Sequence, residues 1–112
     1  AKFTDDMAPA NCLIAKVCHA KIGNGIVKSK MFISDDCKII KAVLEPNASM
    51  GKHTQKNNEF IYVISGQARI IIDGQEEIIN KDEVHYCPLG STHEIVNHTD
   101  EDLVLLDITV EK

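Results

Sequence analysis

Hydrophobic and polar residues alternate along this chain in short stretches that end at turn residues. Alternation with a period of two predicts β-strands, because successive side chains of a strand point to opposite faces. The pattern predicts strands over residues 13–17, 26–33, 38–44, 59–64, 68–72, 76–79, 84–87, 92–96 and 103–110. Short strands at intervals of about ten residues are typical of an all-β sandwich or barrel, which is the fold class we expect.

The same alternation assigns side chains of the middle strands to faces. Asp73-Gly74 predicts a hairpin between two of the strands, since these residue types tolerate the left-handed backbone of a tight turn. Both faces of residues 59–64 are apolar, which predicts a strand in the middle of a sheet. In a closed barrel we expect one set of side chains to line the interior (Ile61, Val63, Ile70 and Ile72) and another to face outward (Phe60, Tyr62 and Ile64).

Length and charge limit the classes of function. The chain has 112 residues, 44% of them hydrophobic, which suits a single domain over residues 1–112. A net charge of −5 and a single arginine, Arg69, argue against nucleic acid as a partner. The acidic balance disfavours anionic membranes, and the apolar runs are too short to cross a bilayer. Residues 1–20 are expected to add an edge strand or an arm that reaches a second copy.

The cysteines indicate a reducing compartment. Their spacing is loose and contains no C-x-x-C pair, which is unlike a zinc-binding cysteine cluster; they are Cys12, Cys18, Cys37 and Cys87. A chain of this size with an apolar core needs no disulfides. The first residues are polar, without the apolar stretch of a secretory signal. We therefore expect reduced thiols and a cytoplasmic protein.

Two stretches hold polar residues at a spacing that suits a metal cage or a ligand pocket. His53 and Gln55 are two apart, so in an extended strand they project to the same face. Glu59 opens the next apolar run and His93 opens a later one. Each is a metal-ligand residue type or close to one.

With these residues in place, the chain resembles the cupin superfamily. The first motif of that family, G-x5-H-x-H-x3-E-x6-G, is similar to residues 47–66, and the second, G-x5-P-x-G-x2-H-x3-N, to residues 82–97. The matching positions are His53, Glu59, Gly66, Pro88, Gly90, His93 and Asn97. The resemblance implies a small double-stranded β-helix, a jelly-roll barrel, and a homodimer in which Phe60, Tyr62 and Ile64 are covered.

Three positions depart from the family pattern. Asn47 and Asp82 stand where the family has glycines, and both types tolerate a left-handed backbone, so the fold is unaffected. Gln55 stands where the family usually has its second histidine. The resemblance then implies that His53, Gln55, Glu59 and His93 hold a divalent metal ion. An amide oxygen is a harder and weaker ligand than an imidazole, which favours manganese, iron, zinc or nickel over copper.

Two classes of function follow from this site. In the first, the protein is an enzyme whose metal acts as a Lewis acid on a small polar substrate, sugar-like or carboxylate. Glu59 would move a proton and Tyr86 would supply a phenol, in an isomerase, lyase or dioxygenase reaction. In the second, the barrel binds a sugar or small acid without turnover and without a tightly bound metal.

The remaining polar residues of interest fit no ligand position. His19, His85 and His98 fit no defined position of either motif, so we expect them on the surface. Asn97 is expected to tie down a loop through side-chain hydrogen bonds.

Overall fold

The computed structural model describes residues 14–20, 27–33 and 36–110, of which residues 14–20, residues 27–33 and His53 are described by their backbone alone. The described residues form strands throughout, and none of them forms a helix long and apolar enough to cross a membrane. The strands are β1 (Ile14–Ala20), β2 (Val27–Ile33), β3 (Cys37–Leu44), β4 (Ser49–Thr54), β5 (Asn58–Ser65), β6 (Gln67–Ile72), β7 (Gln75–Asn80), β8 (Val84–Cys87), β9 (Thr92–Val96) and β10 (Leu103–Val110).

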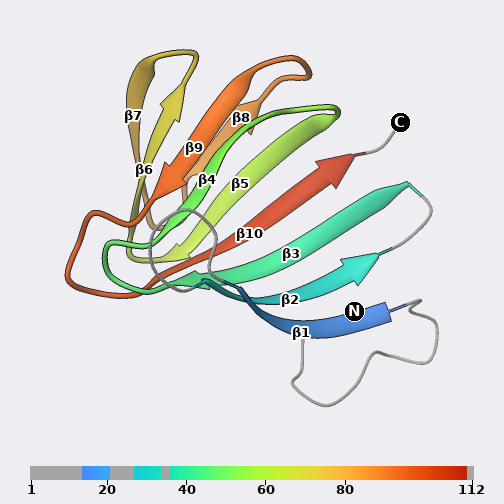
Figure 1. Ribbon diagram of the computed structural model, residues 1–112, viewed down its shortest axis with the longest axis horizontal. Helices are drawn as coiled ribbons and strands as arrows, with labels where there is room; N and C mark the ends of the chain where they lie inside the picture. The colour runs from blue at the N-terminus through green and yellow to red at the C-terminus, as the bar shows by residue number, and fades with distance from the viewer. Residues whose placement is uncertain (1–13, 21–26, 34–35, 111–112) are drawn as a thin grey trace.

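The strands form two antiparallel sheets that face each other (Figure 1). One sheet has the order β1-β2-β3-β10-β5-β8 and the other has the order β4-β9-β6-β7. This arrangement confirms the predicted all-β jelly-roll fold. β5 lies between β10 and β8, as its two apolar faces predicted, and β1 lies at the edge of the larger sheet.

Several turns depend on a left-handed backbone. Asp73 and Gly74 have φ angles of 47° and 83° in the tight hairpin between β6 and β7, as the sequence predicted. Asn47 and Asp82 have φ angles of 67° and 66°, which confirms that they take over the backbone role of glycine. At Gly66, with φ of 88°, an added Cβ would lie 2.7 Å from the carbonyl oxygen of Asp102. Both the backbone conformation and the lack of room for a side chain therefore require glycine.

Asn97 holds together the loop between β9 and β10. Its side-chain amide donates hydrogen bonds to the carbonyl oxygens of Leu44 (2.9 Å) and Glu101 (2.7 Å). Its side-chain oxygen accepts hydrogen bonds from the backbone N–H (3.0 Å) and the hydroxyl (2.9 Å) of Thr99. The residue is fully buried, and these bonds confirm the predicted structural role.

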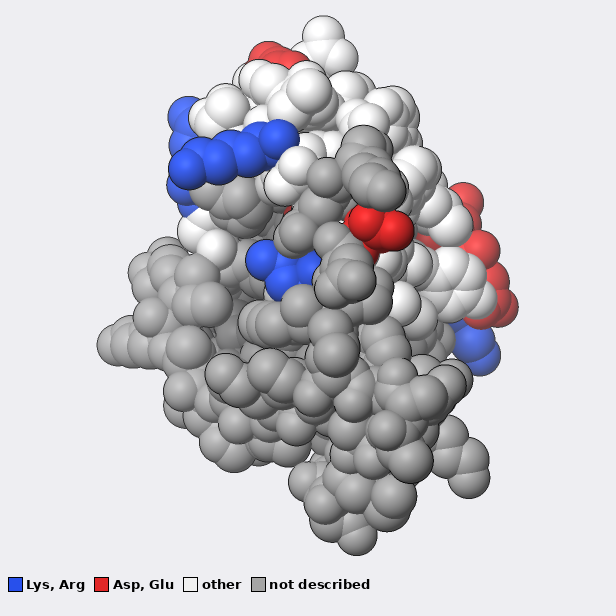
Figure 2. Space-filling model, turned by 90° about the vertical axis from the view of Figure 1, so that its right-hand side faces the viewer, with Lys and Arg blue, Asp and Glu red and all other residues white. Residues whose placement is uncertain are grey.

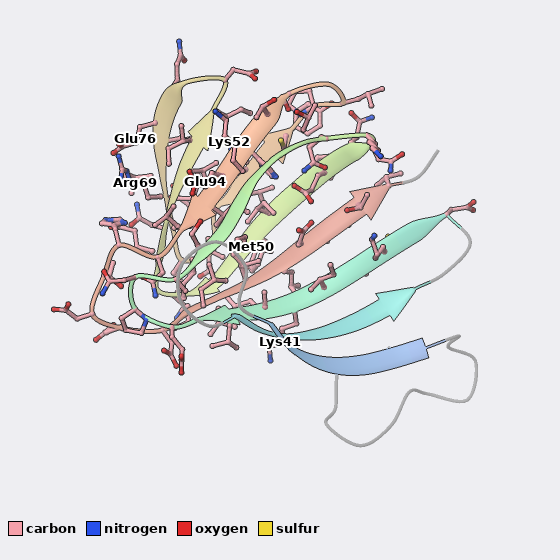
Figure 3. The ribbon with its side chains drawn as sticks, viewed as in Figure 1. Lys41, Met50, Lys52, Arg69, Glu76 and Glu94 are labelled. Carbon is pink, nitrogen blue, oxygen red and sulfur yellow. The ribbon has the colours of Figure 1, made fainter. Side chains whose placement is uncertain are left out.

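The core lies between the two sheets and is apolar at one end of the barrel. Its buried hydrophobic residues include Ala42, Leu44, Ile61, Val63, Ala68, Ile70, Ile95, Leu103 and Leu105. Ile61, Val63 and Ile70 therefore face inward as predicted, and Ile72 is half-buried. The outer face is charged in places: Arg69 and Glu76, from neighbouring strands of the β6–β7 hairpin, form an exposed ion pair at 2.6 Å (Figure 3).

Candidate functional site

Polar side chains fill the other end of the barrel, and strand pairing explains how they meet. Across the larger sheet, Lys38 of β3 pairs with Thr109 of β10, Thr109 pairs with Glu59 of β5, and Glu59 pairs with Cys87 of β8. Two residues further into the barrel, the same strands bring Asp107 into register with Ile61, and Ile61 with His85. His93 of β9 comes from the facing sheet. Residues distant in sequence thus become neighbours through cross-strand register.

His93 is the centre of this polar end. Its Nε2 lies 2.8 Å from the side-chain nitrogen of Gln55 and 2.9 Å from Oε1 of Glu59. The three residues are 1%, 7% and 4% exposed. The structure therefore brings together three of the four predicted metal ligands. For the fourth, His53, the backbone pairs directly opposite His93, and its side chain lies outside the described part of the structure.

A second carboxyl group, Asp107, lies beside Glu59. Burial raises the pKa of the Glu59 carboxyl, while a hydrogen bond with Asp107 and the positive charge of Lys38 oppose the rise. Both carboxyl groups are buried at the polar end of the barrel. Burial lowers the pKa of His93, and the negative charge of Asp107 partly offsets that effect.

A cavity of about 430 Å³ adjoins these groups, at the end of the barrel where β3 and β5 begin and β10 ends. Glu59, Gln55 and Asp107 contribute to its wall together with the amino groups of Lys38 and Lys56. Figure 2 faces this end of the molecule and shows positively charged side chains at the upper left and near the centre of the view. The cavity thus combines a buried acidic floor with lysines, which suits a small polar ligand that carries negative charge.

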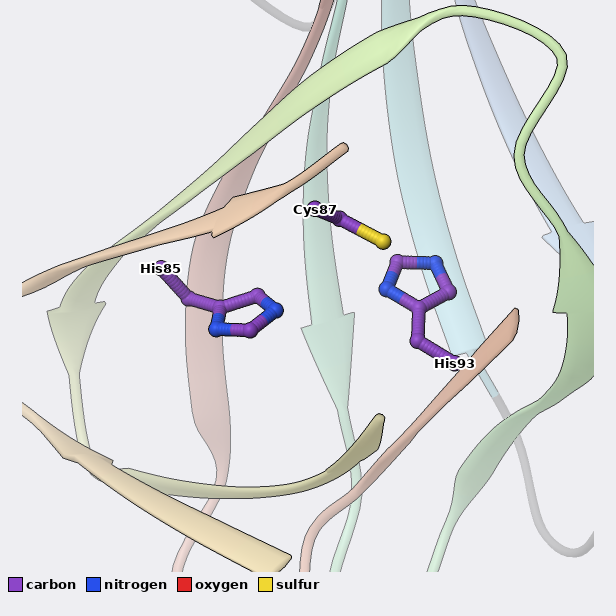
Figure 4. Close-up of side chains that lie close together, drawn as sticks. All are labelled: His85, Cys87 and His93. Carbon is purple, nitrogen blue, oxygen red and sulfur yellow. The ribbon is translucent and has the colours of Figure 1, made fainter. Parts of the chain in front are cut away.

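A second cluster meets at His93. His85, Cys87 and His93 each offer one ligand atom, and these atoms lie within 4.8 Å of one another (Figure 4). His85 is only 3% exposed, so its predicted place on the surface is wrong. The prediction failed because the motif does not determine which side chains of β8 point into the barrel. His85 and Cys87 are two apart, and the inward position of Cys87 carries His85 inward as well. His98 is exposed as predicted, and the side chain of His19 lies outside the described residues.

Tyr86 takes no part in either cluster. It lies between His85 and Cys87 in β8, so its side chain points to the outer face and is 48% exposed. Its ring stacks on the ring of Phe60, with the two ring centroids 5.0 Å apart. Its hydroxyl donates a hydrogen bond of 3.0 Å to the side chain of Asn58. The structure therefore does not bring Tyr86 to the predicted metal ligands.

Asp107 is the site residue that the sequence analysis missed. It sits in the last strand, far from both motifs, and no local spacing marks it. One signal was available. Leu103, Leu105 and Asp107 are two residues apart, so a strand places the charged side chain on the same inward face as the two leucines. A charge at such a position is rarely buried without a function or a partner.

Comparison with known proteins agrees with this architecture. In solved structures the fold is similar to a predicted oxalate decarboxylase of Thermotoga maritima, with 19% identity over 89% of this chain and 100% of that chain and a TM-score of 0.77. It is also similar to an RmlC-like cupin of Shewanella frigidimarina (16% identity, 97% of this chain, 93% of that chain, TM-score 0.74). A third is a cupin sugar phosphate isomerase of Silicibacter pomeroyi (20% identity, 77% of this chain, 60% of that chain, TM-score 0.69).

At these identities the likeness establishes the fold alone. No curated protein matches the chain at a significant level. A family model for the cupin domain matches residues 41–109, which is more than half of the chain and includes both polar stretches. The chain therefore belongs to the cupin domain family.

Proposed function

We propose that this cupin is a metal-dependent enzyme that acts on a small, negatively charged polar substrate, sugar-like or carboxylate, in the cavity at the polar end of the barrel. The observation that carries the proposal is the convergence of Gln55 and Glu59 on one ring nitrogen of His93, at 2.8 and 2.9 Å. All three residues are buried at the wall of the barrel interior.

The donor set fits a divalent ion. Nε2 of His93 carries either one lone pair or one hydrogen, so it cannot make a good hydrogen bond to both neighbours at once. A cation bound by Nε2, by the carboxylate of Glu59 and by the amide oxygen of Gln55 would satisfy all three groups. We include His53 as the fourth ligand, because its backbone pairs directly with that of His93. Mixed nitrogen and oxygen ligands suit manganese, iron, zinc or nickel.

The side chains around this point supply the rest of the chemistry. When bound, the metal would polarise an oxygen of the substrate as a Lewis acid. Lys38 and Lys56 line the cavity and would orient an anionic group of the substrate. Glu59 and Asp107 both line the cavity, and either carboxyl group would accept or release a proton next to the substrate, which is the role of a general acid or base.

The similar structures support the choice of substrate class. One is described as a predicted oxalate decarboxylase and another as a sugar phosphate isomerase, so both names point to small anionic molecules. A cavity of about 430 Å³ that is lined by two carboxyl groups and two lysines is consistent with ligands of that size and charge. Tyr86, on the outer face of β8, is not included among the catalytic residues of this proposal.

The alternative function is a barrel that binds such a molecule without turnover and without metal. The contact between Gln55 and His93 favours it, since the amide and the imidazole already satisfy one another at 2.8 Å. Under this alternative the protein would bind sugar phosphates or small acids equally well before and after treatment with a chelator.

Metal analysis separates the two functions. Protein treated with a chelator is incubated with Mn²⁺, Fe²⁺, Zn²⁺ or Ni²⁺, freed of excess ion and assayed for retained metal. We expect stoichiometric retention of at least one ion by the natural chain, loss of an oxygen-preferring ion such as Mn²⁺ in Gln55→Ala and Glu59→Gln, and unchanged retention in the exposed control His98→Ala. Failure to retain any ion after reconstitution would contradict the enzyme proposal and leave the binding alternative.

We also propose that two copies associate through the outer face of β5. Phe60, Tyr62 and Ile64 are half-buried on this face, and a second copy would cover them. Light scattering after size exclusion measures the mass directly. A mass of 12.4 kDa at micromolar concentration, equal to that of one chain, would contradict the dimer.

A further inference from the structure

We propose a second metal site in this barrel, distinct from the first, in which His85, Cys87 and His93 bind a thiophilic divalent ion such as zinc. The three side chains are 3%, 0% and 1% exposed, and their ligand atoms lie within 4.8 Å of one another. Two imidazoles and one thiolate with an open fourth position form a donor set that binds zinc in proteins. His85 and Cys87 stand at variable positions of the second family motif, between Asp82 and Pro88.

The orientation of His85 is what a metal ligand requires. Its Nδ1 lies 3.2 Å from a carboxylate oxygen of Glu77, an exposed residue of β7, so the imidazole donates its Nδ1 hydrogen to that carboxylate. This contact places the lone pair on Nε2, which is buried and has no hydrogen-bond partner among the described residues. A carboxylate that holds the far nitrogen of a metal-bound histidine is the usual outer support of such sites.

Cys87 supplies the sulfur on the same face of β8. The Ser91 hydroxyl donates its hydrogen to the carbonyl oxygen of Pro88, so at 3.1 Å its oxygen accepts the thiol hydrogen of Cys87. Burial raises the pKa of this thiol, the contact with Ser91 lowers it in part, and negative charge on Glu59, Asp73 and Asp107 raises it. The same negative charges attract a cation, whose binding would replace the thiol proton.

The distances allow an ion to bind after small side-chain movements. Zinc lies about 2.0–2.3 Å from nitrogen and sulfur ligands, which places those ligand atoms about 3.5 Å apart. The present ligand atoms are at most 4.8 Å apart, so binding calls for a contraction of up to about 1.3 Å. Figure 4 shows the two imidazole rings facing each other with the thiol beside them, so this contraction needs no change of strand register.

The two sites share His93 but use opposite sides of its ring. Nε2 belongs to the cluster with Gln55 and Glu59. Nδ1 is the atom that the cluster with His85 and Cys87 would use. A neutral imidazole has one lone pair, so one ion excludes the other. The barrel therefore offers a choice between an oxygen-rich site for harder ions and a sulfur-containing site for softer ones.

Cobalt(II) titration tests the second site, because a bound thiolate gives a charge-transfer absorption in the near ultraviolet that nitrogen and oxygen ligands do not. The natural chain, stripped of metal and kept reduced, is titrated with Co²⁺ alone. We expect the thiolate absorption in the natural chain, its loss in Cys87→Ser and in His85→Ala, and its retention in Cys37→Ser, which removes a half-buried thiol of β3. Glu77→Gln should weaken cobalt binding by about 10- to 100-fold with the absorption retained.

The same titration keeps the two sites apart. Gln55→Ala and Glu59→Gln should keep the thiolate absorption even if they remove the metal of the proposed catalytic site, so either proposal can fail alone. Circular dichroism checks that each variant is folded, and Cys87→Ala replaces Cys87→Ser if the hydroxyl unfolds the core. Cobalt binding without thiolate absorption in Glu59→Gln, where the first site is removed, or absorption that survives Cys87→Ser and disappears in Cys37→Ser, overturns the second site.

Discussion

The two ends of this barrel are built by the same strands yet differ in their chemistry. In β10 the inward positions run from Thr109 and Asp107 at one end to Leu105 and Leu103 at the other. β5 repeats the change, from Glu59 through Ile61 to Val63, and β9 repeats it from His93 to Ile95. The period of two is unchanged throughout, so the fold is the same at both ends and only the side chains differ.

This difference separates stability from function. The apolar end removes hydrophobic surface from water, which is the main stabilising term in folding. The polar end places carboxyl and imidazole groups in the interior, where each loses hydration and contributes little net stability. Buried groups with raised or lowered pKa are typical of functional sites, and here Glu59 lines the cavity while His93 lies directly behind it, 2.9 Å from Oε1 of Glu59. We therefore expect substitutions at the two ends to have different consequences.

The largest effect is expected at the apolar end. Leu105→Ala removes a fully buried side chain and should lower the free energy of unfolding by about 2–5 kcal/mol. Leu106→Ala is the matched control, because the neighbouring leucine of β10 lies on the other face and is only half-buried. Urea denaturation measures both. Equal losses in the two variants would contradict the assignment of faces.

At the polar end, removing a charge should preserve or increase stability while it abolishes metal retention. In metal-free protein the raised pKa of Glu59 means that the folded state holds its proton more tightly than the unfolded state does. This contribution to stability is present below the ordinary pKa of 4.5 and is lost as pH rises through the higher pKa of the folded state. Glu59→Gln remains neutral, so its stability relative to the natural chain should increase as pH rises through that range.

Urea denaturation at several pH values provides the measurement. Glu101→Gln, on the exposed loop before β10, is the matched control for a lost carboxylate. A Glu59→Gln variant whose stability relative to the natural chain falls with rising pH would show that the carboxylate form is the one stabilised by folding.

A smaller effect is expected at the rim of the cavity. Lys38→Met removes an ammonium group that lines the cavity, and it should weaken binding of a small anion such as phosphate by about 10-fold, since a hydrogen bond to a charged group contributes roughly 1.5 kcal/mol. Lys41→Met, three residues further along β3 and on its other face, is the matched control (Figure 3). Isothermal titration gives both affinities. Equal weakening would indicate general charge attraction without a defined anion position.

The smallest effect is expected on the outer face, where solvent screens the charges. The Tyr62 hydroxyl donates a hydrogen bond of 2.7 Å to Asp82, and this bond to the neutral phenol raises the pKa of Tyr62. Asp82→Asn keeps a residue that tolerates the left-handed backbone but removes the charge, so the pKa should fall toward 10.0. Ultraviolet titration of tyrosinate in a Tyr86→Phe background reports on Tyr62, and an unchanged midpoint would exclude Asp82 as the cause.

Much of this molecule could be predicted from local rules. Strand positions and the inward phase of Ile61, Val63 and Ile70 follow from alternation, which depends only on neighbouring residues. The left-handed turns at Asn47 and Asp82 follow from the same local sterics. The spacing of Gln55, Glu59 and His93 also identified residues that the structure brings together, because both motifs place these residues at the same end of the barrel.

The tertiary structure alone decided which inward residues meet across strands. Asp107 reaches Glu59 because β10 pairs with β5, and Cys87 reaches Glu59 because β8 pairs with the other edge of β5. Sequence spacing contains no information on these registers, since they arise from the closure of the whole barrel. The second cluster around His93 exists for the same physical reason: local alternation chooses the face of each side chain, but only the packing of distant strands chooses its neighbours.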